Sequence, residues 1–201
     1  MSETETAQEP FPKRVAFESC RFEGGNFVLR PFSPVRDGSR LFEAVQASLP
    51  DLSPFLPWAV PDYSLETARE FVEDVPQLWD QGNAFHFGIF SKEDGRCLGG
   101  VGLNMVSRAY RILNLGYWVA SAEKGKGLAT QSARLLVEFA FRELGALRVE
   151  VLAAVTNRAS RRVAEKLGAQ FEGVLRNRLL VHGRPQDGAM ASLIPQDLDP
   201  S

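Results

Sequence analysis

A glycine-rich bend between a predicted strand and a predicted helix constrains the fold of this chain more than any other feature. The segment reads Gly116-Tyr-Trp-Val-Ala-Ser-Ala-Glu-Lys-Gly-Lys-Gly-Leu-Ala-Thr, and a run with helical periodicity follows it directly. Gly125 and Gly127 allow backbone torsions that other residues avoid, and they leave no side chain to block an anion. The first amides of a helix are unpaired and lie at the positive end of its dipole. With Lys124 and Lys126 beside them, these amides suit a phosphate or diphosphate.

The bend by itself does not identify a ligand. An ordinary glycine-rich turn would have the same composition, and the spacing of neither a Walker loop nor a dinucleotide fingerprint is present. A nucleotide-binding regulatory domain is disfavoured because no acidic residue is correctly placed to bind a ribose. The neighbouring elements and motifs must therefore decide between these interpretations.

Strands and helices alternate along the chain in an order that predicts a mixed sheet. Period-two patterns indicate strands, and apolar residues at helical spacing indicate helices. The predicted order is a strand at 27–31, a helix ending at Pro50, a proline-rich loop at 51–63, a helix at 64–80, strands at 84–90, 96–104 and 111–120, a helix at 128–144, a strand at 147–155, a helix at 157–167, and strands at 170–182 and 188–194. Hairpins that alternate with helical crossovers give an α+β, three-layer domain.

Length and composition fit one globular domain. The chain has 201 residues, and we expect a flexible tail at 1–13 and a single domain at 14–197. The formal net charge of -2 argues against broad nucleic-acid binding. Membrane association is not expected because no apolar run approaches the roughly 18 residues of a membrane span. The acidic start does not resemble a secretory signal, and Cys20 and Cys97 have neither metal-site nor disulfide spacing. We therefore expect a cytoplasmic protein without a metal.

Several motifs together resemble those of one enzyme family. The bend Lys124-Gly-Lys-Gly-Leu-Ala resembles motif A of the GNAT acetyltransferases, Gln/Arg-x-x-Gly-x-Gly/Ala, with Lys at the usual Gln/Arg place. Leu115-Gly-Tyr-Trp-Val and Thr156-Asn-Arg-Ala-Ser look like the Rim-type branch, which is ribosomal-protein-alanine acetyltransferase-like. So do Leu29-Arg-Pro-Phe and Phe55-Leu-Pro-Trp. The similarity spans roughly residues 27–194 in the family's order.

The resemblance implies a fold, a reaction and a co-substrate. The fold would be a mixed, mostly antiparallel seven-stranded sheet with a V-shaped cleft, flanked by four helices. The reaction would be transfer of the acetyl group of acetyl-CoA to an amine by direct attack in a ternary complex. The acceptor would be a protein N-terminus or a small-molecule amine. The alternative is a non-catalytic acyl-CoA-binding module of the same fold.

The resemblance also assigns residues to acetyl-CoA. The pantetheine arm would pair with the strand near Trp118 and Val119. The diphosphate would lie on the bend and the first turn of the helix. Asn157 and Ser160 match family positions beside the pantetheine and the thiol. The implied residues of the bend and first turn are Lys124, Gly125, Lys126, Gly127, Leu128, Ala129 and Thr130.

Two proton transfers need catalytic groups, and the sequence departs from the family here. Many relatives carry Glu where this chain has Asn114, some carry Glu where it has Leu179, and the usual late Tyr is replaced by Ala191. Asn cannot act as a base, so the missing acid and base favour the non-catalytic alternative. By resemblance, Ser160 would return a proton to the sulfur.

The general base stays unassigned at this stage. His86 on a predicted strand can act near neutral pH, although a histidine between two phenylalanines is more often structural. Asp62, Glu70 or a chain of water molecules are the other candidates.

A proline-stiffened aromatic loop would form the wall of the acceptor site. Its aromatic residues Phe55, Trp58 and Tyr63 suggest an apolar or peptide-like contact. Asp51 and Asp62 in the same loop, with Glu66 of the helix that follows, could attract an ammonium group. A homodimer through the late strands is a further expectation.

Overall fold

One sheet of eight strands runs through residues 10–198, the part of the chain that this computed structural model describes. In spatial order the strands are β1 (Phe22–Glu23), β2 (Phe27–Pro31), β3 (Phe85–Ser91), β4 (Cys97–Ser107), β5 (Ile112–Val119), β6 (Arg148–Ala154), β8 (Arg184–Leu193) and β7 (Gln170–Val181). All neighbours are antiparallel except β5 and β6. The predicted mixed, mostly antiparallel sheet is confirmed. The sheet has eight strands rather than the seven expected, because the two-residue β1 adds one.

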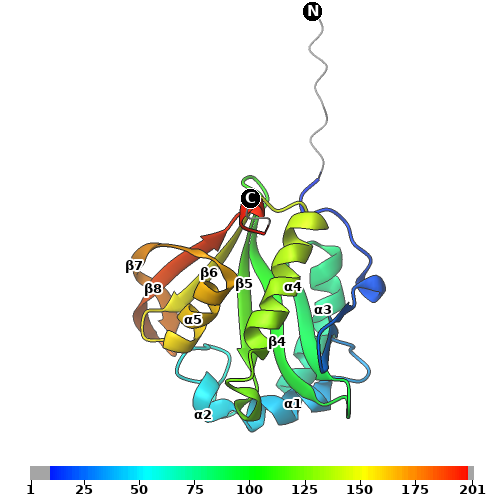
Figure 1. Cartoon of the computed structure of the whole chain (residues 1–201). Helices are drawn as coiled ribbons and strands as arrows, with labels where there is room; N and C mark the ends of the chain where they lie inside the picture. The colour runs from blue at the N-terminus through cyan, green and yellow to red at the C-terminus, as the bar shows by residue number, and fades with distance from the viewer. Residues whose placement is uncertain (1–9, 199–201) are drawn as a thin grey trace, which may run out of the picture.

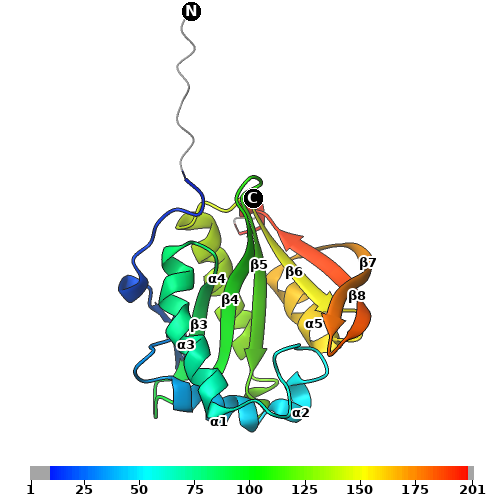
Figure 2. The ribbon, with the colours of Figure 1, turned by 180° about the vertical axis from the view of Figure 1, so that it is seen from behind.

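Helices cover both faces of this sheet. They are α1 (Gly38–Gln46), α2 (Leu49–Leu52), α3 (Leu65–Asp80), α4 (Leu128–Arg142) and α5 (Arg158–Leu167). α4 and α5 lie on the face in front in Figure 1, whereas α1 and α3 lie on the face in front in Figure 2. The helix beyond the four expected is α2, which carries Pro50 in its first turn. Proline is tolerated there because the first amides of a helix lack internal partners.

Each face of the sheet carries its own apolar cluster, and β3 shows how alternate side chains serve both. Phe85, Phe87 and Ile89 belong to one cluster with residues of α4. Phe90 belongs to the other cluster, together with Val72 of α3. Alternation along a strand sends successive side chains to opposite faces. The sheet is therefore buried on both sides where the site is built.

The two parallel strands diverge after a short stretch of pairing. β5 and β6 pair only over Ile112–Asn114 and Arg148–Glu150. Beyond this point Leu115–Val119 stays paired with β4, and β6 stays paired with β8. Figure 2 shows the two strands moving apart from the edge where they meet. This separation confirms the V-shaped opening that was expected.

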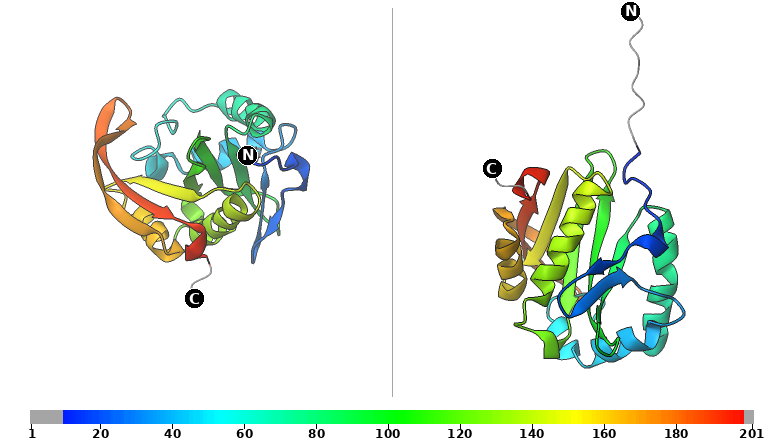
Figure 3. Two further views of the ribbon diagram at one scale, coloured as in Figure 1. Left: turned by 90° about the horizontal axis from the view of Figure 1, so that it is seen from above. Right: turned by 45° about the vertical axis from the view of Figure 1, so that its right-hand side comes forward.

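The segment before β1 lies against the domain at the sheet edge opposite β7, as Figure 3 shows. Of the expected tail, residues 1–9 lie outside the described residues. Residues 11–13 differ from the expectation. The ring of Phe11 packs against the core, and the backbone N–H of Lys13 donates to the carbonyl of Leu144 at 3.1 Å. The boundaries of a single domain at 14–197 stay a prediction.

Within residues 10–198, none of the helices combines the length and the apolar composition that a membrane span requires. No group of three His, Cys, Asp or Glu side chains among these residues is arranged to hold a metal ion.

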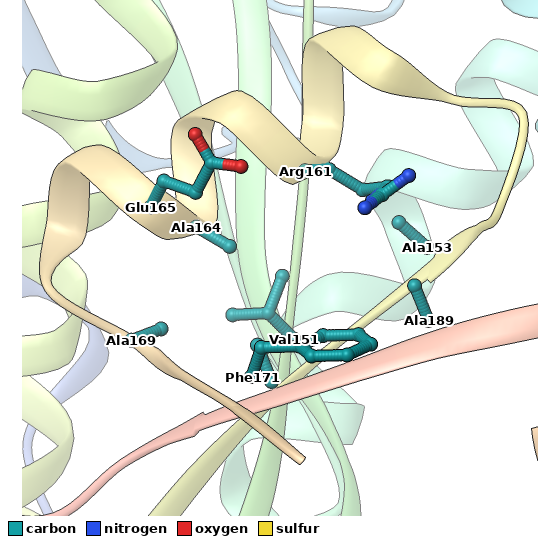
Figure 4. A pocket seen from close by; sticks show the side chains of 9 residues that line it. Val151, Ala153, Arg161, Ala164, Glu165, Ala169, Phe171 and Ala189 are labelled. Carbon is teal, nitrogen blue, oxygen red and sulfur yellow. The ribbon is translucent and has the colours of Figure 1, made fainter. Parts of the chain in front are cut away.

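A small cavity between α5 and the sheet leads to a stability prediction. The cavity has a volume of about 60 Å³, and alanines form much of its lining, with Arg161 and the ring of Phe171 at its sides (Figure 4). Ala189 lies on β8, opposite Ala153 of β6. An Ala189→Val substitution should fill part of the cavity and raise the free energy of unfolding by about 0.5–2 kcal/mol. Thermal unfolding followed by circular dichroism would measure it, and a lower melting temperature would show that the cavity cannot accept two methyl groups.

Candidate active site

The glycine-rich bend between β5 and α4 forms an open cradle. Gly125 has φ +77° and Gly127 has φ +78°, a left-handed conformation that strongly favours glycine. No atom lies within 4 Å of a Cβ built on Gly125, so the space above it is free. Gly127 is the N-cap of α4, and the buried side chain of Leu128 anchors the first turn. The amides of the first turn are thereby held in place while they lack helical partners.

Both lysines of the bend are ion-paired with acidic side chains. Lys124 Nζ lies 2.6 Å from Asp51 Oδ1, and Lys126 Nζ lies 3.0 Å from the buried Glu123. The hydrogen bond from Lys124, with a second from Ser121 Oγ, lowers the pKa of Asp51 below its usual value. Asp51 lies in α2 rather than in the loop predicted from residue 51, and it fixes the bend to that helix. Its carboxylate is thereby paired with Lys124, whereas the sequence suggested that it could attract an ammonium group. The free amides and the helix dipole are the main attraction for an anion.

The splayed edge of β5 presents backbone amides to the cleft. The backbone N–H of Ala120 donates to Leu98 O at 2.8 Å across the β4–β5 pair. Because donors alternate in direction along a strand, the N–H groups of Tyr117 and Val119 point away from β4, to the side that β6 has left. Trp118 points its side chain to the α3 face, where the ring lies over Gly100. The two residues expected at the pantetheine thus lie on the open edge.

The first turn of α5 faces this edge and contributes a hydroxyl pair. Asn157 caps the helix, since its Oδ1 accepts a hydrogen bond from Ser160 N at 3.0 Å. Tyr117 Oη donates to Ser160 O at 2.9 Å and lies 3.0 Å from Ser160 Oγ. Burial raises the pKa of Tyr117 to about 12, and the hydrogen bond with Ser160 opposes this rise. Tyr117 was not predicted, although the motif Gly-Tyr-Trp placed it on the strand that leads to the bend.

A cavity of about 400 Å³ opens beside the cleft on the α3 face. Its lining includes Gly116, Tyr117 and Trp118 of β5, so it adjoins the point where the strands separate. The expected acceptor residues Trp58 and Tyr63 also line it. Phe55, expected in the same wall, is half-buried and is not among the lining residues.

Glycines in β4 make the space for two rings on this face. A Cβ on Gly100 would lie 2.8 Å from Trp118 Nε1, and a Cβ on Gly102 would lie 2.7 Å from His86 Nδ1. Glycine inside a strand often marks such a close approach. That signal in the sequence Leu98-Gly-Gly-Val-Gly was not used in the prediction of the site.

His86 lies in this cavity, largely surrounded by apolar groups. Its ring meets the ring of Phe71 at a centroid distance of 5.2 Å. Burial lowers the pKa of His86 to about 4, so the imidazole is neutral at physiological pH. The structure brings His86 together with the acceptor residues and leaves it a weak base.

The positions where relatives carry acidic residues or Tyr hold no base. Asn114 Nδ2 donates to Asn104 Oδ1 at 2.9 Å across β5 and β4. Ala191 is buried in β8. The other two candidates for a base, Asp62 and Glu70, are exposed and do not line the cavity. The chain therefore supplies no carboxylate from these positions to the cavity.

The proline-rich loop is tied to both walls of the site. Asp51 contacts the bend through Lys124, and Ser53 O lies 2.9 Å from Nε2 of His182 at the tip of the β7–β8 hairpin. The partners are far apart in sequence, since His182 follows Ser53 by 129 residues. This contact was not predicted, because only the folded chain brings the hairpin tip to the loop.

The chain is similar to proteins that carry out acetyl transfer. A family model described as an acetyltransferase (GNAT) domain matches residues 26–170. The probable N-acetyltransferase YjcK of Bacillus subtilis (strain 168) is 32% identical over 136 residues, which make up 67% of this chain and 75% of that protein. The ribosomal protein uS5-alanine N-acetyltransferase of Escherichia coli (strain K12) is 25% identical over 127 residues, 63% of this chain and 66% of that protein. Mycobacterium smegmatis RimJ in complex with CoA-disulfide superposes with a TM-score of 0.77 at 25% identity, covering 87% of this chain and 85% of that chain.

Proposed function

Since the chain belongs to the GNAT acetyltransferase family, we propose that its cleft brings acetyl-CoA together with an amine that enters through the cavity on the α3 face. The family model is named for acetyl transfer and the Bacillus subtilis relative for N-acetyl transfer, and the Mycobacterium smegmatis RimJ structure contains CoA-disulfide. The observation that carries the proposal is the separation of β5 from β6 directly above a left-handed glycine bend. The open edge of β5 and the first amides of α4 are then available to one extended ligand.

The residues of the bend fit the diphosphate of the coenzyme. The free space over Gly125 admits its oxygens, and the amides of Gly125, Gly127, Leu128 and Ala129 would donate to them. Thr130 adds a hydroxyl donor one residue further along the helix. Lys124 and Lys126 hold the bend in shape through their ion pairs with Asp51 and Glu123, and these pairs add no net charge. Hydrogen bonds from the amides to the negatively charged diphosphate are charge-assisted and therefore stronger than neutral ones.

The pantetheine arm would lie along the open edge of β5. The N–H groups of Tyr117 and Val119 point into the gap left by β6, and Asn157 and Ser160 face it from α5. The amide of Val119 would stabilise the negative oxygen that forms when the amine attacks the thioester carbonyl. Fixing the amine and the thioester in one orientation supplies much of the rate.

The acceptor cavity would deprotonate the amine by desolvation. An ammonium group loses stability in an apolar site, so its pKa falls and the neutral, nucleophilic form enters. No Asp, Glu, Lys or Arg is among the described residues that line the cavity. His86 would then serve mainly as a neutral hydrogen-bonding group, and the proton of the attacking nitrogen would leave to water through the open mouth.

Ser160 is the group that we propose returns a proton to the sulfur. Formation of the C–N bond and cleavage of the C–S bond leave a thiolate, which accepts this proton. Tyr117 donates to the carbonyl of Ser160, and its oxygen lies 3.0 Å from the Ser160 hydroxyl, so it positions that hydroxyl; Ser160 would regain its proton from water. The high pKa of Tyr117 keeps this hydroxyl protonated over the working range.

The pH dependence of the rate should follow the acceptor. An amine with a pKa near 8 should give kcat/KM values that rise up to about pH 8 and then level. His86, whose pKa is lowered by burial to about 4, changes charge below this range, and Tyr117, raised by burial to about 12, above it. Initial rates of thiol release with two amines of different pKa test this. A midpoint that stays at one pH for both amines would indicate a base on the enzyme.

The acceptor class proposed from the comparisons is a protein N-terminus or a small-molecule amine. The Escherichia coli relative is named for an alanine of a ribosomal protein. A cytoplasmic location and a homodimer through the late strands also stay proposals. Exposed apolar side chains on β7, such as Phe171 and Leu180, support the second of these.

A non-catalytic acyl-CoA-binding module is the second candidate function. The observation that favours it is Asn114, which is held by Asn104 where relatives carry Glu. Release of free thiol from acetyl-CoA, measured with a panel of primary amines, separates the two. Turnover above the hydrolysis rate supports the transferase. Tight coenzyme binding without turnover for any amine would support the module.

A further inference from the structure

The acceptor cavity is walled by aromatic rings and floored by glycines. Trp58 packs against Trp118 with ring centroids 5.9 Å apart, and against Tyr63 with centroids 6.1 Å apart. Phe71 closes the side formed by α3, and the glycines of β4 and β5 form the floor. The volume of about 400 Å³ lies at the lower end of the roughly 300–1,000 Å³ typical of small-ligand sites. The space suits one compact group rather than a long chain.

The polar groups of the cavity carry no formal charge at neutral pH. Thr67, Asn104 and the neutral His86 are the polar residues, besides the aromatic ones, that line it. Asp51 of α2, an acidic residue expected at the acceptor site, is bound by Lys124 and Ser121. A charged group on the ligand would therefore lose its water without gaining a partner, which is strongly unfavourable.

Trp58 is the aromatic residue of this wall that stays partly exposed to solvent. Its side chain is 41% exposed although its ring borders an apolar cavity. It lies on the loop that Asp51 and Ser53 fix to the two sides of the site. A ligand that fills the cavity would cover this ring and remove more apolar surface from water, which favours binding.

We propose that the acceptor carries a bulky, uncharged, apolar or aromatic group next to its amine, and that this group fills the cavity against Trp58, Phe71 and Trp118. The inference rests on the proposed acetyl transfer and adds its specificity. Acceptors with a small side group leave the cavity partly empty, and acceptors with a charged side group are rejected by desolvation. Trp58 is the main residue that determines this preference.

The first test compares short peptides that differ only in the first residue. Peptides of the form X-Gly-Gly amide, with X as Phe, Leu, Ala, Ser, Glu or Lys, have similar α-amines and different side groups. Thiol release should give kcat/KM values for Phe and Leu about 100-fold above those for Ala and Ser, because each methylene in an apolar pocket is worth roughly 10-fold or more. Glu and Lys should react most slowly.

The results of this comparison distinguish a failure of the inferred specificity from a failure of the proposed acetyl transfer. Equal or faster reaction of the Ala, Ser, Glu or Lys peptide would overturn the inferred specificity and leave the acetyl transfer intact. Coenzyme binding without reaction of any peptide or free amine in the panel would overturn the proposed transfer, and the inference with it.

A matched pair of variants tests the role of Trp58. Trp58→Ala should lower kcat/KM for the Phe peptide about 10-fold or more and change the Ala peptide much less. Tyr110→Ala removes an aromatic ring that is 74% exposed and is not among the residues lining the cavity, so it should leave the ratio of the two rates unchanged. If the ratio of kcat/KM for the Phe peptide to that for the Ala peptide were the same in Trp58→Ala as in Tyr110→Ala, Trp58 would not determine the preference. Near-ultraviolet circular dichroism of both variants would show that each is folded.

Discussion

Replacing Gly127 by valine should weaken coenzyme binding by at least about 100-fold while the protein stays folded. The residue has φ +78°, where a β-branched side chain is strained by about 1–3 kcal/mol. Relief of this strain would turn the first amides of α4 away from the diphosphate, and each lost hydrogen bond to a charged group costs about 1.5–3 kcal/mol. Titration calorimetry with coenzyme A measures the effect.

The control for this variant has the same backbone strain at another place. Gly168 ends α5 with φ +85° and has free space around it. Gly168→Val should lower the melting temperature in a similar way and keep the affinity for coenzyme A. If Gly127→Val retained the wild-type affinity, the bend would not be the diphosphate site.

Replacing Ser160 by alanine should lower kcat by about 100-fold, at the lower end of the range for general acid catalysis. The loss arises because the variant lacks the Ser160 hydroxyl, which lies 3.0 Å from the Tyr117 hydroxyl, and the thiolate would leave without a proton donor. The cap of α5 should survive, since Asn157 accepts its hydrogen bond from the backbone of Ser160. Pre-steady-state rates with saturating acetyl-CoA measure the chemical step.

The leaving group provides the readout that a structural role would not change. A thioester whose thiol has a lower pKa leaves more readily and needs less protonation. The deficit of Ser160→Ala should therefore shrink with such a thioester. Tyr117→Phe should show a smaller deficit, and the two losses should not add, because both residues belong to one hydrogen-bonded pair. Ser132→Ala, whose hydroxyl bonds to Leu128 O within α4, is the matched serine control. A deficit that is constant across thioesters would rule out Ser160 as the acid.

Local patterns predicted most of the sheet and the helices. Alternation marked β3, β4 and β5, and Gly168 correctly marked the end of α5, where its φ is positive. The end predicted at 144 before Gly145 was two residues late, because α4 ends at Arg142. The two-residue β1 was beyond such patterns, since it is defined only by its pairing with β2. The separation of β5 from β6 was expected from the family resemblance alone. No periodicity in either strand indicates where their pairing stops.

The site likewise has one part that local sequence patterns predicted and one part that they did not. The bend was visible because glycine torsions and helix amides are local properties. The cavity was not visible, because it needs Trp58, His86 and Gly102 to meet from three separate segments. The ion pair of Lys124 with Asp51 likewise changed the role expected of the carboxylate. Contacts of this range depend on the tertiary fold and leave no pattern in the sequence.

The measurement that tests the account most directly is a crystal structure of the protein with coenzyme A bound. We expect the diphosphate oxygens to lie about 2.7–3.2 Å from the amides of Gly125, Gly127 and Leu128, with the pantetheine along the edge of β5 that faces β6. A coenzyme bound elsewhere on the protein, with no phosphate on this bend, would contradict the account.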